Sequence, residues 1–143
     1  MSALLTKEEI EDVLANKFDS LTGEFSGRTI RRLDIGVFPW HASIEISVLL
    51  EDDRCDPKDI AAWPHYNVSD LAEGKWPQAV DLCKRMMKMW EADAKSAHGL
   101  FQVIGEAVRA PRLSAVIQKF SRSNQFEVSL FDPDNKKSAN YCA

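Results

Sequence analysis

The fold of this chain is decided by residues 33–48, which read Leu33-Asp34-Ile35-Gly36-Val37-Phe38-Pro39-Trp40-His41-Ala42-Ser43-Ile44-Glu45-Ile46-Ser47-Val48. On each side of the central Phe-Pro-Trp-His connection, apolar residues alternate with polar residues or glycine, the two-residue period of a strand with one buried face. The short connection predicts that the two strands pair as an antiparallel hairpin. We expect its other face to lie in solvent, with the polar residues Arg32, Asp34, Ser43, Glu45 and Ser47.

Helices are predicted on both sides of the hairpin. Thr6 followed by Glu9 fits a capping box, and apolar residues then recur at helical spacing. Pro77 is expected to be the first residue of a second helix, because proline tolerates that position. Residues 100–108 carry a third helical stripe, either as a separate helix or as a kinked continuation of the second. Residues 112–121 fit either a short helix or a strand.

The last strand completes the element order. Phe126, Val128 and Leu130 alternate with polar residues. The order predicts an α+β fold with a small, mainly antiparallel sheet, made by the N-terminal hairpin and this C-terminal strand. An N-terminal helix and two to three C-terminal helices pack on it. The length of 143 residues fits one domain over residues 1–143. The tail after residue 136 is expected to be loosely held.

Cysteine usage and hydropathy predict a cytoplasmic protein. The chain has three cysteines, an odd number at wide spacing, whereas secreted disulfide frameworks usually carry an even set. The first residues lack the basic start and apolar stretch of a signal peptide. No apolar run approaches the roughly 20 residues needed to cross a bilayer. We therefore expect a protein of a reducing compartment with no membrane partner.

The charge distribution bears on the kind of partner. The net charge is -4, with acidic residues in excess over residues 1–75 and basic residues in excess over residues 76–143. A nucleic-acid-binding protein needs a concentrated basic face, so we expect no nucleic-acid partner. Two oppositely charged halves suit electrostatic steering of a charged protein partner, although they equally suit two solvated surfaces.

The sequence carries no familiar catalytic or metal-binding motif. No histidine or cysteine pair has metal-ligand spacing, and the scattered glycines form no phosphate-binding loop. We therefore expect no metal, no cofactor and no enzyme activity. The least favoured alternative is a small enzyme in which Cys55 is activated by His41 or His65, with Tyr66 nearby. The carboxylates beside Cys55 oppose formation of the thiolate that this chemistry needs.

Loop aromatics beside an acidic run suggest a protein-binding surface. Three tryptophans stand next to prolines outside the predicted regular elements, where they serve either as interface anchors or as core residues. Aromatic anchors rimmed by negative charge would suit a basic protein surface. The predicted partner-binding residues are Trp40, Asp52, Asp53, Asp56, Asp59, Trp63 and Tyr66.

Three segments carry a resemblance to a known class of protein: Phe38-Pro39-Trp40-His41-Ala42-Ser43-Ile44-Glu45, residues 62–69 (AWPHYNVS) and Phe131-Asp132-Pro133-Asp134-Asn135. With them, and in size, charge and layout across most of its length, the chain resembles the small acidic α+β immunity proteins that bacteria make beside polymorphic or contact-dependent toxins. The resemblance implies a cytoplasmic antitoxin that binds its cognate toxin domain and blocks the active site. A toxin with nuclease activity would present a basic site to the four aspartates.

Two other functions remain open at this stage. A secretion chaperone or adaptor would also be small and acidic, and would be an obligate dimer that buries the helix containing Met86, Met87 and Met89. The small enzyme described above is the other alternative. Light scattering separates a dimeric adaptor from a monomeric inhibitor, and turnover that is lost on histidine substitution would identify the enzyme.

Overall fold

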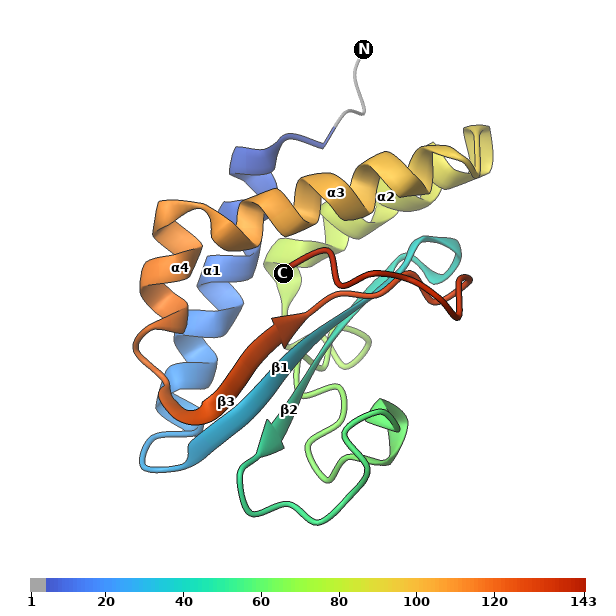
Figure 1. Cartoon of the computed structure of the whole chain (residues 1–143). Helices are drawn as coiled ribbons and strands as arrows, with labels where there is room; N and C mark the ends of the chain where they lie inside the picture. The colour runs from blue at the N-terminus through green and yellow to red at the C-terminus, as the bar shows by residue number, and fades with distance from the viewer. Residues whose placement is uncertain (1–4) are drawn as a thin grey trace.

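The computed structural model describes residues 5–143, except for the side chains of Ser96 and Ala97. Over this range the chain forms an α+β fold with a three-stranded sheet (Figure 1). The helices are α1 (Lys7–Glu24), α2 (Val80–Ala92), α3 (Ser96–Arg109) and α4 (Pro111–Ile117), and the strands are β1 (Thr29–Phe38), β2 (Ser43–Leu50) and β3 (Ser121–Ser129). The predicted fold class is confirmed, and residues 112–117 are helical.

The sheet has the strand order β2-β1-β3. The predicted hairpin is confirmed: β1 and β2 are antiparallel, with Ile35 opposite Ile46. β3 runs parallel to β1, with Leu33 opposite Val128, so the sheet is mixed. A parallel neighbour requires a crossover connection, which the chain provides through α2, α3 and α4.

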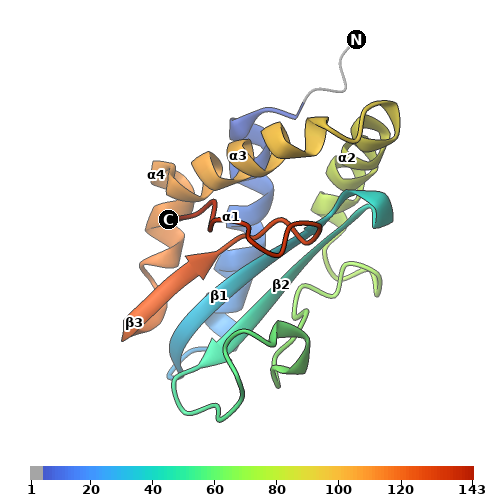
Figure 2. The ribbon, with the colours of Figure 1, turned by 45° about the vertical axis from the view of Figure 1, so that its right-hand side comes forward.

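The helices cover one face of the sheet (Figures 1 and 2). The first helix begins at the predicted cap, where the Thr6 side chain accepts a hydrogen bond from the Glu9 backbone at 3.1 Å. The Glu9 carboxylate does not complete a capping box, because it pairs with Arg85 on α2. The core lies between this helical layer and the apolar side of the hairpin, which contributes Leu33, Ile35, Val37, Ile44, Ile46 and Val48.

The polar face of the hairpin, expected in solvent, is largely buried. Arg32 is 9% exposed, Asp34 6% and Ser47 1%, whereas Ser43 and Glu45 are only partly covered. The reason is that the irregular segment after β2 folds back over this face and along the edge of β2 (Figure 2). There, Val48 N–H donates to the His65 carbonyl at 3.0 Å. We call this covered side the outer face of the sheet.

The C-terminal tail is docked rather than loose, contrary to expectation. Tyr141 N–H donates to the Leu130 carbonyl at 2.9 Å. The Asn140 side chain accepts from Leu130 N–H and donates to the Val128 carbonyl, both at 3.0 Å. These bonds attach the tail to the end of β3, where it also packs against α3 at Gly105. No helix in the part of the chain that the structure describes is long and apolar enough to span a membrane.

Candidate binding surface on the outer face of the sheet

The predicted binding residues are not all brought together. Trp40 lies in the connection before β2, whereas Asp52 and Asp53 follow its other end. An eight-residue strand is about 26 Å long at roughly 3.3 Å per residue. Trp40 is therefore not brought together with the first aspartates of the acidic run.

Trp40 joins the hairpin tip to the helical layer. Its half-buried ring lies 6.0 Å from Phe38 and 6.1 Å from Trp90 of α2, measured between ring centroids. Aromatic rings at such separations stabilise one another. The observed contacts of Trp40 are thus internal ones, and its partly exposed ring keeps only part of its surface for a partner.

The acidic run itself is held in ordered turns. We call residues 51–59 the acidic segment. Asp53 Oδ2 accepts from Leu50 N–H and Asp56 Oδ1 accepts from Lys58 N–H, each at 2.9 Å. Asp52 and Asp59 are exposed, and no residue in the described part of the chain forms a hydrogen bond or an ion pair with either side chain. Of the four predicted aspartates, these two therefore have their carboxylates fully available to a partner.

Trp63 is an interior residue, so its predicted role as a surface anchor is wrong. Its ring is 3% exposed. Its Nε1–H donates to the Asp56 carbonyl at 3.3 Å, and the Arg32 guanidinium lies 5.7 Å from the ring centroid. The ring is covered because its own segment folds back over the sheet. Trp63 therefore fixes the acidic segment in place and is not itself accessible to a partner.

Arg32 on β1 connects three parts of the molecule. Its Nε donates to Ser129 Oγ on β3 at 3.0 Å, and its Nη1 donates to the Pro57 carbonyl in the acidic segment at 3.1 Å. Its guanidinium also lies 5.6 Å from the Phe131 ring centroid. A largely buried guanidinium that satisfies several acceptors is both strongly held and difficult to replace. Sequence reasoning missed it, because polar residues on a strand pattern resemble a solvated face.

Asp34 lies two positions further along the same face. Its Oδ1 accepts a hydrogen bond of 2.6 Å from Ser129 Oγ. Burial raises the pKa of Asp34 from 3.8 to about 6, against the lowering effects of the Ser129 hydrogen bond and the Arg32 charge. Desolvation disfavours the charged form of a carboxyl group, which accounts for the direction. Asp34 therefore changes its charge close to physiological pH.

A small crevice opens on the outer face beside Asp34. Tyr66 is 42% exposed, and among the described residues it is the only predicted binding residue outside the acidic segment that is clearly exposed. Its hydroxyl donates a hydrogen bond to Glu45. This hydrogen bond is the largest cause that raises the pKa of Tyr66 to about 12. The crevice has a volume of about 210 Å³ and is lined by Asp34, Gly36, Phe38, Glu45, Ser47, Ile60, Ala61 and Tyr66. We call it the Asp34 crevice.

Gly36 shapes the floor of this crevice. A Cβ atom at this position would come 2.9 Å from the Phe38 ring and 3.3 Å from the Glu45 carbonyl oxygen. The absence of a side chain lets the Phe38 ring lie over the strand. Sequence reasoning placed Gly36 in the hairpin but had no signal for a hollow there, since the covering residues come from a distant segment.

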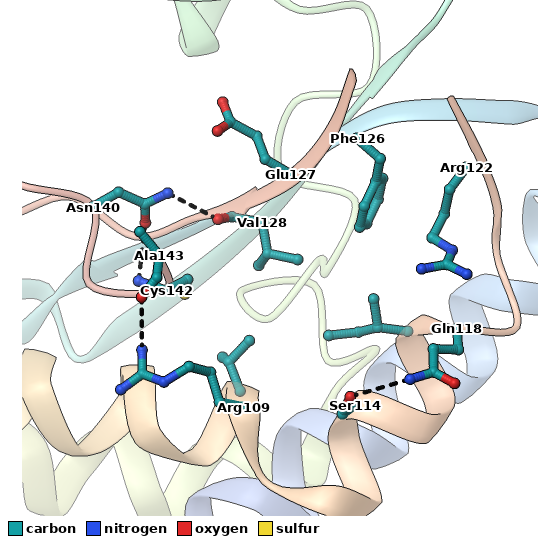
Figure 3. A pocket seen from close by; sticks show the side chains of 12 residues that line it. Arg109, Ser114, Gln118, Arg122, Phe126, Glu127, Val128, Asn140, Cys142 and Ala143 are labelled. Carbon is teal, nitrogen blue, oxygen red and sulfur yellow. Dashed lines mark hydrogen bonds between the residues drawn. The ribbon is translucent and has the colours of Figure 1, made fainter. Parts of the chain in front are cut away.

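A larger cavity of about 450 Å³ lies on the other side of β3 (Figure 3). It is bordered by Arg122 and Phe126 of β3, by α4, and by the C-terminal tail. Arg109 donates to the Tyr141 carbonyl at 2.8 Å and to a terminal oxygen of Ala143 at 3.4 Å. The tail of the chain therefore already uses the guanidinium of Arg109, one of the two arginines that line this cavity.

The residues of the alternative enzyme site are dispersed. His41 is exposed at the hairpin tip, whereas Cys55 lies beyond the opposite end of β2. The His65 ring contacts Phe25, with centroids 5.1 Å apart. Within residues 5–143, no cluster of three or more histidine, cysteine, aspartate or glutamate side chains has the geometry to hold a metal ion. Met86 of the methionine-containing helix is fully buried in the core, and Met87 and Met89 are half-buried.

The pKa of Asp34 makes a direct prediction about stability. Because its folded-state pKa is raised, Asp34 contributes stability that is complete below about pH 3.8 and is lost as the pH rises through about 6. Asp34→Asn cannot titrate, so it should not share this loss. The difference in unfolding free energy between the variant and the wild type should shift in favour of the variant by about 2–3 kcal/mol on going from about pH 4 to about pH 7. Urea denaturation at both pH values measures this difference. Glu127→Gln, which removes an exposed carboxylate near Arg32, should show no comparable gain.

Comparison of the chain with protein-family models, with curated proteins and with solved structures finds no match.

Proposed function

We propose that this protein is a non-catalytic protein-binding module, and specifically a cytoplasmic immunity protein that neutralises a cognate bacterial toxin by binding it. The observation that carries the proposal is the anchored acidic segment. Two exposed carboxylates, Asp52 and Asp59, project from a backbone that Arg32 and Trp63 hold against the sheet.

Anchoring matters because binding is weakened when a loop must be ordered at the same time. A segment that is already fixed loses little conformational freedom in the complex, so more of the interaction energy appears as affinity. Fixed carboxylates also produce a steady negative field, which raises the association rate with a basic protein surface. The active site of a nuclease toxin would be such a surface, with the carboxylates in the positions of substrate phosphates.

The acidic segment can be tested with a charge-removing double variant. The protein is co-expressed with the product of the gene directly upstream, and the association rate is measured at low and at physiological salt. We expect Asp52→Asn/Asp59→Asn to slow association about tenfold at low salt and to flatten its salt dependence, because steering by exposed charge is screened beyond about 8 Å at physiological salt.

Glu91→Gln/Glu106→Gln is the matched control. It removes the same charge from exposed positions on α2 and α3, in the helical layer on the opposite side of the sheet. This control should associate at the wild-type rate. Equal slowing by both double variants would show that only net charge matters, and an unchanged rate for the aspartate variant would exclude the acidic segment as the steering surface.

A further inference from the structure

The Asp34 crevice combines an apolar lining with two carboxylates. Phe38, Ile60 and the Tyr66 ring supply most of its walls, and Asp34 and Glu45 supply the negative charge. A second hollow of about 140 Å³ adjoins it around Asp34 and Ile60, and is lined on its far side by Phe131 and Pro133. Ligand sites commonly have this composition, with apolar walls and a few placed polar groups.

Asp34 is only half satisfied by the protein. Its Oδ1 accepts from Ser129, but no residue in the described part of the chain donates to Oδ2. The residue is 6% exposed and lines both hollows. Among the described residues, only Trp76 Nε1 is a fully buried side-chain polar atom without a partner, so Asp34 Oδ2 keeps some contact with solvent. This oxygen is therefore free to accept a hydrogen bond from a ligand in either hollow.

Several titratable groups surround Asp34. Arg32 lies on the same strand, but its guanidinium binds Ser129 and Pro57 and borders a different cavity. Glu45 on β2 lines the crevice with Asp34, whereas Glu127 on β3 pairs with Arg32 outside it. The Tyr66 hydroxyl and the Cys142 thiol also interact with Asp34, but their pKa values are raised to about 12, so both are neutral. Arg32 therefore offsets part of the negative charge of Asp34 from outside the crevice. None of the residues that line the crevice carries a positive charge to offset the remaining charge of Asp34 and Glu45.

We propose that the Asp34 crevice binds an organic cation of the alkylammonium or alkylguanidinium type. Its charged head would donate to Asp34 Oδ2 and to Glu45, and its aliphatic stem would lie against Phe38, Ile60 and Tyr66. This inference rests on the proposed function for the source of the cation, which is a lysine or arginine side chain of the partner protein. The acidic segment leads directly into Ile60, so a basic surface steered by Asp59 arrives beside the crevice.

The test uses small probes and needs no partner protein. The n-butylammonium ion is titrated into the full chain and followed by amide NMR shifts of the crevice residues, with n-butanol and n-butyrate as the neutral and anionic controls. We expect a dissociation constant in the millimolar range, about what so few atoms can supply. Binding of n-butanol should be at least about tenfold weaker.

Two further measurements identify the carboxylate. Asp34→Asn should weaken n-butylammonium binding at least about tenfold, whereas Glu127→Gln, outside the crevice, should leave it unchanged. In the wild type, affinity should fall about tenfold between pH 7.5 and pH 5, as Asp34 is protonated below its pKa of about 6. The pH series needs no variant, so it remains informative if Asp34→Asn folds poorly.

Equal binding of n-butanol and n-butylammonium, or an affinity that does not change with pH, would overturn the cation site. The source of the cation is tested separately in the toxin complex. If Asp34→Asn weakens the complex as it weakens the probe, the cation is a side chain of the partner. If the probe needs Asp34 but the complex does not, the site takes a small free amine and its assignment to the partner is wrong, while the proposed function stands on the acidic segment alone.

Discussion

Replacing Arg32 by alanine is expected to lower the unfolding free energy by about 3–5 kcal/mol, the usual cost of removing one partner from a buried charged network. The substitution leaves the Pro57 carbonyl and the Ser129 hydroxyl without their donor, and leaves Asp34 without the nearest positive charge. It also removes the cation that lies over the Trp63 and Phe131 rings. Urea denaturation at neutral pH measures the loss.

The same variant should release the acidic segment. Hydrogen exchange should increase at the amides of Asp59, Ala62 and Trp63, whose hydrogen bonds lie within the turns that Arg32 holds against the sheet. Arg32→Lys keeps the charge but not the planar fork, so it should recover only part of the stability. Arg31→Ala, at the neighbouring half-buried position, is the control and should change stability by less than about 1 kcal/mol.

The proposed role of Arg32 has a clear point of failure. If Arg32→Ala loses less than about 1 kcal/mol and leaves exchange in the acidic segment unchanged, another contact holds that segment. The proposal that Arg32 preorganises the acidic segment for binding would then be wrong. A large loss of stability without faster exchange in the segment would place the importance of Arg32 in its contacts outside the segment, with Ser129, Asp34 and the Phe131 ring.

Substituting Gly105 by alanine is expected to detach the C-terminal tail from α3. The added Cβ would lie 2.1 Å from the Tyr141 carbonyl oxygen and 3.0 Å from its carbon, which are backbone atoms with little freedom to move. Detachment loses the hydrogen bonds of Tyr141 and Asn140 to β3 and the packing of Tyr141 on Phe101. At about 1 kcal/mol for each such contact, we expect a loss of about 3–4 kcal/mol.

The thiol of Cys142 reports whether the tail has moved. Burial raises the pKa of Cys142 to about 12, so the docked thiol should react slowly with a disulfide reagent. In a Cys55→Ser background, which removes the other half-buried thiol, Gly105→Ala should accelerate the labelling of Cys142.

Gly99→Ala is the matched control on the same helix. A Cβ at Gly99 meets nothing within 4 Å, and alanine favours the helix by up to about 1 kcal/mol. This variant should therefore be as stable as the wild type or slightly more stable, with unchanged labelling. Faster labelling in Gly99→Ala as well would attribute the effect to the helix and not to the close approach of Tyr141.

The candidate binding surface was predictable only in part. The sequence located the acidic segment, and Asp52 and Asp59 are exposed as a binding role requires. It misplaced Trp63, because a tryptophan beside a proline in an irregular segment has the same local pattern whether its ring faces solvent or the sheet. It missed Asp34, because alternation along a strand reports polarity and not whether a distant segment covers that face.

The sequence by itself determined the elements that depend on neighbouring residues. The alternation on both sides of Pro39 predicts the hairpin, and the cap at Thr6 predicts the first helix. Together with the later helical stripes, these two elements indicate an α+β fold. These features follow from local periodicity and capping, which are readable one segment at a time.

Only the tertiary structure decided what lies on the outer face. Arg32, Pro57 and Ser129 come from three distant parts of the chain, and their contact makes a buried network out of residues that alone would be solvated. The parallel pairing of β3 and the docking of Tyr141 at Gly105 arise in the same way. The physical reason is that burial is a property of what packs against a residue, and single-segment periodicity carries no record of that partner.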